Sequence, residues 1–116
     1  MIKIYSYSKC STCRNAVKFL EKKKLDFKVI DIVENPPSKA DLKKMLKFKG
    51  GELKRLFNTS GLVYKELGLK DKLDKLSKDE ALSLLTENGK LVKRPFLLSD
   101  DLGLTGFKEK EWQENL

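Results

Sequence analysis

The chain has 116 residues, a length that is enough for one domain and too short for two. Hydrophobic residues make up 40% of it, which suffices for one core. Charged residues account for 36%, and no apolar run approaches the ~20 residues that a membrane-spanning helix needs. The formal net charge of +8 suits an acidic partner. Zinc-finger spacing, an RNP-type aromatic motif and a glycine-rich phosphate loop are all missing, so we do not expect direct nucleic-acid binding.

The first third of the chain predicts a strand, a helix and a second strand. Ile2–Tyr7 and Phe27–Ile32 are rich in β-branched and aromatic residues, which is typical of strands. Between them, apolar residues recur with the spacing of one helix face, which predicts an amphipathic helix to about Lys24: Cys13, Ala16, Val17 and Leu20. This order forms a βαβ unit, for which we expect parallel strands and a right-handed crossover.

Residues 36–89 are expected to be almost wholly helical. After Asn35-Pro36-Pro37, Ser38 can cap a helix, and Asp41 three residues later comes close to a capping box. Ser77 and Glu80 have the same spacing at the start of a helix over Ser77–Asn88. Between these two helices, shorter ones are predicted at residues 53–57, 62–69 and 73–76.

Strand character returns near the end of the chain. We predict strand residues at Leu91-Val92 and Phe96–Leu98, a hairpin turn, a strand over Leu104–Phe107 and a helix over Lys108–Leu116. With the cysteines after the first strand, the order β-α-β, helices, β-β-α is the thioredoxin arrangement. We therefore expect one α/β domain over residues 1–116, with a mixed four-stranded sheet. Residues 1–35 and 90–116 would form its thioredoxin-like core and residues 36–89 a helical insertion.

Both cysteines lie in Ser8–Arg14, with the spacing Cys-x-x-Cys. Cys10 falls at the start of the first helix, where unpaired N–H groups and the helix dipole favour a thiolate, and Arg14 adds a positive charge. Cys13 is in phase with the buried face of that helix and would act as the resolving thiol. Ser11 and Thr12 are small and polar and would shape the loop for a substrate. The pattern favours dithiol–disulfide chemistry over a pair of inert thiols.

Other uses of the cysteines fit the sequence poorly. A structural zinc site needs four ligands, and the chain has two cysteines and no histidine, so no metal or bound cofactor is expected. The same composition leaves no Cys–His pair for acyl transfer. Lys3 interrupts the apolar start, so no secretory signal is recognised, and a single Cys-x-x-Cys pair favours a reducing, cytoplasmic compartment.

Six stretches spread along the chain match one known family: residues 5–14, 36–38, 57–61, 64–67, 91–95 and 106–108. On these motifs the sequence resembles the arsenate reductase-like and Spx/MgsR-like branch of the thioredoxin superfamily, from end to end. The resemblance implies a thioredoxin-like fold and a cis bond before Pro95, which would face the cysteine loop. It also implies that Cys10 is the nucleophile and that Arg94 lies beside it. Asn58 stands where the family's second oxyanion-binding arginine is expected, and is a candidate for positioning substrate.

The family divides in function, and the resemblance leaves three readings open. Arsenate reductases that use glutathione and glutaredoxin carry three arginines, of which only Arg94 is matched here, since Ser99–Leu104 contains none. Spx and MgsR are redox-sensing regulators that bind the α-subunit of RNA polymerase, and the chain shares their cysteine pair but differs from their pattern at residues 58–61. We expect foremost a monomeric thiol–disulfide redox protein whose partner is a redox protein or glutathione, with glutathione or thioredoxin as electron donor.

Overall fold

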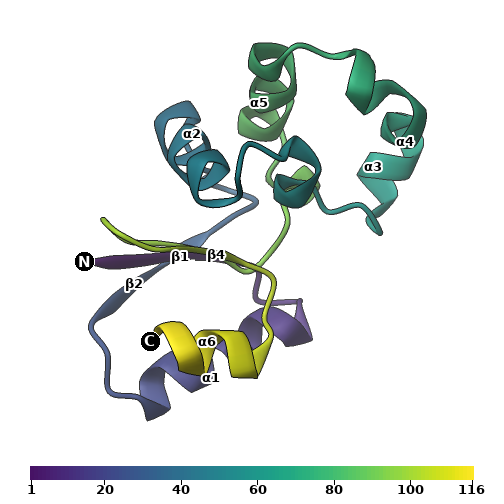
Figure 1. The fold of residues 1–116 in the computed structure, drawn as a ribbon. Helices are drawn as coiled ribbons and strands as arrows, with labels where there is room; N and C mark the ends of the chain where they lie inside the picture. Colours follow the sequence, from purple (N-terminus) through teal and green to yellow (C-terminus); the bar gives the residue numbers. More distant parts are fainter.

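A four-stranded mixed sheet separates two layers of helices (Figure 1). The computed structural model describes residues 1–116. The strands lie in the order β2-β1-β3-β4, and their bounds are β1 Ile2–Ser6, β2 Phe27–Asp31, β3 Phe96–Leu98 and β4 Gly103–Thr105. β1 is parallel to β2 and antiparallel to β3, and β3 is antiparallel to β4. The thioredoxin-like α/β fold expected from the element order is confirmed.

The helices cover the two faces of this sheet unequally (Figure 1). On one side lie α1 (Ser11–Lys22) and α6 (Glu109–Asn115). On the other lie α2 (Lys39–Phe48), η1 (Leu53–Leu56), α3 (Leu62–Glu66), α4 (Leu69–Lys72), η2 (Leu73–Lys75), α5 (Lys78–Glu87) and η3 (Gly89–Leu91). None of these helices has both the length and the apolar character needed to cross a membrane. The division of the chain at residues 36 and 89 stays a prediction.

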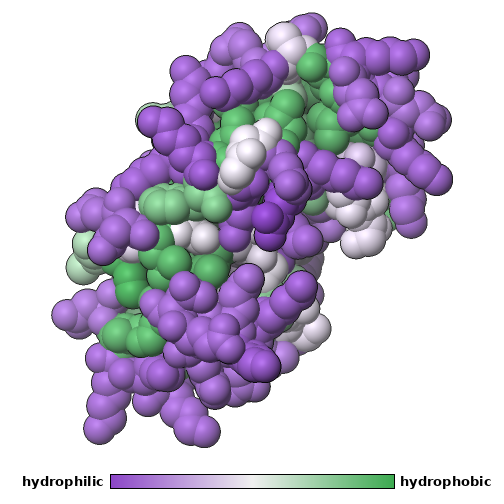
Figure 2. Space-filling model, in the orientation of Figure 1, coloured by the Kyte–Doolittle hydropathy of each residue, from purple (hydrophilic) through white to green (hydrophobic).

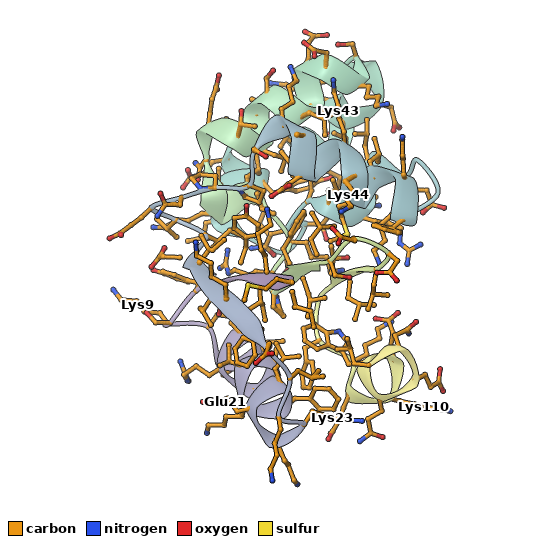
Figure 3. All side chains as sticks on the ribbon, turned by 90° about the vertical axis from the view of Figure 1, so that its left-hand side faces the viewer. Lys9, Glu21, Lys23, Lys43, Lys44 and Lys110 are labelled. Atoms are coloured by element: carbon orange, nitrogen blue, oxygen red, sulfur yellow. The ribbon has the colours of Figure 1, made fainter.

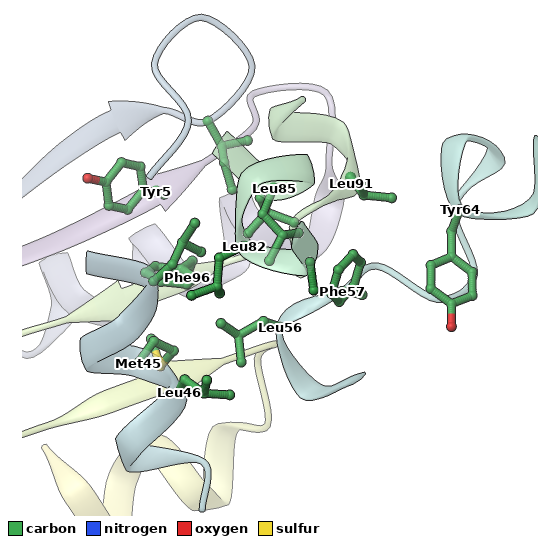
Figure 4. Close-up of a cluster of buried hydrophobic side chains, with 14 of the residues drawn as sticks. Tyr5, Met45, Leu46, Leu56, Phe57, Tyr64, Leu82, Leu85, Leu91 and Phe96 are labelled. Carbon is green, nitrogen blue, oxygen red and sulfur yellow. The ribbon is translucent and has the colours of Figure 1, made fainter. Parts of the chain in front are cut away.

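Alternation along the strands directs neighbouring side chains into two hydrophobic cores. Tyr5 and Phe96 face α2 and α5, and their rings meet edge to face with centroids 5.5 Å apart (Figure 4). Ile4 and Leu97 face α1 and α6, where they pack with the fully buried Trp112. Each such side chain contributes roughly 1.5–3 kcal/mol by leaving water. The sheet is therefore held from both faces.

The predicted strand at Leu91-Val92 is wrong. Leu91 ends η3, and Val92 makes only an isolated bridge to Phe57. The turn forms because the Asn88 side chain accepts a hydrogen bond from the Lys90 N–H at 3.0 Å. Gly89 then lies against the backbone of the residue that follows β2, where an added Cβ would stand 1.7 Å from the Ile32 carbonyl oxygen. Only glycine allows this approach.

Two other boundaries differ by a few residues. α1 begins at Ser11, because Cys10 caps it, and ends at Lys22, because Lys24 adopts a positive φ of 58°. β4 covers Gly103–Thr105 in place of the predicted 104–107, because Gly106 turns the chain with φ 72°. Boundaries of this kind depend on single backbone angles, which hydrophobic periodicity does not report.

Asp41 joins the sheet to α2. Ser38 caps the helix, with its Oγ accepting from the Asp41 N–H at 3.1 Å, as the sequence suggests. The Asp41 carboxylate does not complete a capping box, because it accepts hydrogen bonds from Lys3 Nζ at 2.6 Å and Tyr5 OH at 2.8 Å. Burial, together with Asp41, raises the pKa of Tyr5. At α5, in contrast, Ser77 and Glu80 do form the complete capping box.

Replacing Asp41 with Ala should destabilise the fold by about 1–3 kcal/mol, because it leaves the largely buried Tyr5 hydroxyl and the Lys3 ammonium without their acceptor. Urea unfolding followed by circular dichroism measures this change. Asp100→Ala is the matched control, because that carboxylate is 95% exposed and 3.7 Å from Lys44. Equal unfolding midpoints for the two variants would show that Asp41 does not join the two layers.

Candidate functional site

Cys10 lies in the turn between β1 and α1 and caps the helix. Its backbone is extended, with φ −99° and ψ 116°, and its Sγ accepts a hydrogen bond from the Cys13 N–H at 3.4 Å. The Cys10 carbonyl accepts the first helical bond, from the Arg14 N–H at 3.1 Å. The half-buried sulfur therefore occupies the helix N-terminus, where N–H groups and the dipole stabilise negative charge.

The two thiols have opposite pKa shifts. Burial acts to raise the pKa of Cys10, but hydrogen bonds from the Cys13 backbone and thiol, together with the Arg94 guanidinium, outweigh it and lower that pKa. Cys13 is fully buried, and burial, reinforced by the neighbouring Cys10 sulfur, raises its pKa to about 11. The arrangement favours the thiolate at Cys10 more than at an ordinary cysteine, and it keeps Cys13 protonated at neutral pH.

The accessible side of Cys10 opens into a groove of about 660 Å³. It lies between the start of α1, the turn before α3 and the segment that leads from η3 to β3. In the orientation of Figure 1, the space-filling surface is indented on the right between the upper and lower layers, where these elements meet (Figure 2). Lys90, Lys93 and Arg94 line the groove, and no carboxylate does. The groove therefore suits an anionic ligand.

Arg94 is held in place by neighbours on both sides. Its Nη1 donates a hydrogen bond to the Lys90 carbonyl at 3.2 Å, and its guanidinium carbon lies 5.2 Å from the centroid of the Tyr7 ring. The Arg94-Pro95 bond is cis, as the resemblance implies. Pro95 is buried, and its carbonyl accepts from the Gly106 N–H at 2.9 Å. These contacts keep the guanidinium beside the Cys10 sulfur.

The structure brings together four of the candidate residues and leaves the others outside the groove. The lining includes Cys10, Thr12, Asn58 and Arg94. Cys13 lies behind Cys10 in the core, Ser11 is exposed at the start of α1, and Pro95 is covered. Asn58 is half-buried, and its Oδ1 accepts a hydrogen bond from the Ser60 hydroxyl at 3.4 Å, within the turn before α3.

Arg14 is directed away from the groove. Its Nη1 donates to the Ser8 carbonyl at 2.8 Å, and it lines a different hollow with Val17 and Glu21. It is also not among the groups that shift the pKa of Cys10. The expectation that Arg14 stabilises the thiolate therefore finds no geometric support, because its guanidinium closes the turn before the helix.

Lys90, Lys93 and Tyr7 line the groove and were not predicted as site residues. The sequence signal for the lysines is their place within four residues of Arg94. Elsewhere lysines are spread over the molecule: Lys9, Lys43 and Lys110 are exposed on different sides (Figure 3). Basic composition alone therefore could not single out the pair at the groove. The structure holds no group of three or more His, Cys, Asp or Glu side chains that could bind a metal ion.

Comparison with known proteins places this arrangement in a family. A family model described as the ArsC family matches residues 5–115. The chain belongs to the ArsC family. This confirms the resemblance that the cysteine loop and the Arg94-Pro95 segment carry.

The proteins similar to this chain have different descriptions. An uncharacterized protein, YusI of Bacillus subtilis, is 47% identical over 111 residues, covering 96% of this chain and 94% of YusI. The global transcriptional regulator Spx of Streptococcus agalactiae is 29% identical over 111 residues, covering 96% and 80%. The crystal structure of a possible arsenate reductase from Streptococcus mutans has a TM-score of 0.91 and 43% identity, covering 100% and 98%. Family membership alone therefore does not select one activity.

Replacing Arg94 with Gln should raise the pKa of Cys10, because it removes a hydrogen-bond donor and a nearby positive charge. The pH dependence of iodoacetamide alkylation, measured in a Cys13→Ser background, reports this pKa. Arg14→Gln is the matched control and should leave the midpoint unchanged, since its guanidinium is engaged by Ser8. A shift in the Arg14 variant that equals or exceeds the Arg94 shift would contradict the assignment.

Proposed function

We propose that this ArsC-family protein is a thiol–disulfide oxidoreductase, with Cys10 as nucleophile and Cys13 as resolving thiol. The observation that carries the proposal is the asymmetry of the pair. One sulfur is half-exposed at a cationic groove with a lowered pKa, and the other is fully buried with a raised pKa. A half-exposed thiolate can attack, and a buried thiol behind it is protected until it is needed.

The reaction follows in two exchanges. The Cys10 thiolate attacks one sulfur of a substrate disulfide, forming a Cys10–substrate disulfide and releasing the other half as a thiolate. Cys13 then loses its proton and attacks the Cys10 sulfur, which breaks the bond to the substrate. Two electrons have passed to the substrate, now two thiols, and the protein carries a Cys10–Cys13 disulfide. Glutathione or thioredoxin would return the two electrons and restore the dithiol.

The structure supplies a reason for the order of these steps. The Cys10 sulfur contributes to the raised pKa of Cys13 through its hydrogen bond and its negative charge. Formation of the mixed disulfide removes that charge, so Cys13 becomes more acidic when it must act as the nucleophile. Premature attack by Cys13 on an external disulfide is disfavoured because the side chain is fully buried.

The groove favours an anionic partner. Lys90, Lys93 and Arg94 attract carboxylates, and Thr12 and Asn58 can donate hydrogen bonds to a peptide. Glutathione disulfide and acidic segments of a redox partner protein both have this chemistry. The proposal includes a cytoplasmic location and a monomeric state, because a reduced dithiol suits a reducing compartment and both cysteines lie in one chain.

Cys13→Ser should accumulate one stable glutathionyl adduct on Cys10 when treated with glutathione disulfide, because the resolving step is blocked. Cys10→Ser should form none at Cys13, which is buried. Mass spectrometry of the intact protein, followed by peptide mapping, measures both. Equal labelling of the two variants, or none in either, would refute the division of roles.

Arsenate reduction is a second candidate, favoured by the three cations at the groove and by the similarity to the possible arsenate reductase of Streptococcus mutans. Two of the family's three arginines are missing from the sequence, but Lys90 and Lys93 add positive charge to the groove. Arsenate-dependent formation of arsenite, with glutathione and glutaredoxin as donors, tests it. Arsenite formation that requires Cys10 would favour this activity over general disulfide exchange.

A redox-sensing regulatory role is the third candidate, suggested by the similarity to Spx. Oxidation to the Cys10–Cys13 disulfide would then change affinity for the α-subunit of RNA polymerase. Binding of the purified α-subunit to the reduced and the oxidised protein distinguishes this role. Redox-dependent binding without turnover of disulfide or arsenate would favour the regulator over either enzyme.

A further inference from the structure

A second, smaller hollow adjoins the Cys10 groove. It has a volume of about 180 Å³ and is formed by the end of α2, by η1 and by the segment from β4 into α6. This volume is below the roughly 300–1,000 Å³ of pockets that bind drug-sized ligands. We call it the Lys49 cleft. Its charged lining residues are Lys49, Arg55, Lys93, Lys108 and Glu111.

Lys49 is the unusual member of this set. The residue is only 7% exposed, although lysine is rarely buried without a partner. The three ion pairs of the structure involve other lysines, and the Lys49 ammonium makes no hydrogen bond to the protein. Burial lowers the pKa of Lys49, the Glu111 carboxylate opposes that effect, and Arg55 and Lys93 add to it. The Lys49 side chain lines the cleft, and its ammonium reaches solvent there, because no fully buried side-chain nitrogen of the structure lacks a hydrogen-bond partner.

The cleft is assembled by contacts between segments far apart in the chain. The Thr105 hydroxyl donates to the Arg55 carbonyl at 3.4 Å, which joins β4 to η1. Gly106 contributes backbone only, and the Lys93 side chain crosses it, 3.2 Å from where a Cβ would lie. Lys93 and Gly106 also line the Cys10 groove, so the two hollows are neighbours.

Four positive side chains from different segments thus face one carboxylate in a space of small volume. Arg55, Lys93 and Lys108 are exposed, so these cations repel one another across the mouth of the cleft, and an anion placed among them would lower that repulsion. A planar monoanion would satisfy one or two of these cations, whereas a tetrahedral dianion offers oxygens in several directions. The lining therefore matches a phosphoryl or similar oxyanion better than a single carboxylate.

We propose that the Lys49 cleft binds a small dianion of the phosphate class, with Lys49 as its buried ligand and Arg55, Lys93 and Lys108 as the surrounding cations. The ligand is either inorganic phosphate or the phosphoryl group of a small metabolite. The site is separate from Cys10, and neither Arg94 nor Asn58 takes part in it. The inference does not depend on the thiol chemistry proposed above.

Phosphate titrations of the full-length protein, followed by ¹H–¹⁵N NMR at constant ionic strength against chloride, test this site. Saturable shifts are expected at the amides of Lys49, Gly106 and Lys108. The affinity should fall about tenfold in Lys49→Met and by a smaller factor in Arg55→Gln. Glycerol 3-phosphate, titrated in parallel, distinguishes the two sources: tighter binding of the ester than of phosphate would assign the site to a phosphorylated metabolite.

Two control variants separate this site from other basic surfaces. Arg94→Gln removes a cation of the groove alone, and Lys54→Gln removes a lysine of η1 that lines a different hollow. Both should bind phosphate within twofold of the unaltered protein. Affinity lost in Arg94→Gln but kept in Lys49→Met would overturn the proposal, as would shifts confined to amides around Cys10 or shifts that do not saturate.

Thermal unfolding supplies a readout that a purely structural lysine would not give. In phosphate-free buffer, Lys49→Met should unfold at a higher temperature than the unaltered protein, because it removes the repulsion by Arg55 and Lys93 and keeps an apolar stem of similar size. With phosphate present, the unaltered protein should gain stability and the variant should not. A lower unfolding temperature for Lys49→Met without phosphate would show that the ammonium is already compensated within the protein.

Discussion

β1 is the constraint on which the rest of the structure depends. It lies between β2 and β3, paired along both edges, and its two faces belong to different cores, with Ile4 in one and Tyr5 in the other. Because the strand is fixed on all sides, the turn that leaves it sets Cys10 at the start of α1. Arg94 lies two residues before β3, the strand that pairs with β1. A reactive loop is thereby held on a rigid scaffold.

Positive charge is distributed unevenly over the molecule. Most lysines are exposed and spread over the surface, where solvent screens them (Figure 3). Several cations also line two adjoining hollows, and Lys93 belongs to both. In one hollow Arg94 lies beside the Cys10 sulfur and favours its negative charge, and in the other Lys49 takes part in no ion pair. Both arrangements leave positive charge available to a ligand, because these cations are not neutralised by ion pairs within the protein.

Local signals in the sequence were sufficient to predict most of the helices and strands and the place of the cysteine pair. Hydrophobic spacing predicts the βαβ unit, and Ser77 with Glu80 predicts the start of α5, because both depend on residues a few positions apart. Long-range contacts account for the misses. Gly89 packs against the backbone at Ile32, and the segment predicted as a strand forms η3 there. The Asp41 carboxylate accepts a hydrogen bond from Tyr5 and so does not cap its own helix. Nothing in the run Lys47-Phe48-Lys49 shows which lysine is buried, since that depends on the distant segments that cover it.

The central claim is that the fold gives its two thiols opposite acidities. NMR of the reduced protein labelled with ¹³C at the cysteine Cβ follows each thiol separately as pH rises. The account predicts two separated titrations, with Cys10 deprotonating below the pKa of an ordinary cysteine and Cys13 near 11. Two overlapping titrations at the ordinary cysteine pKa, or the lower pKa at Cys13, would contradict it.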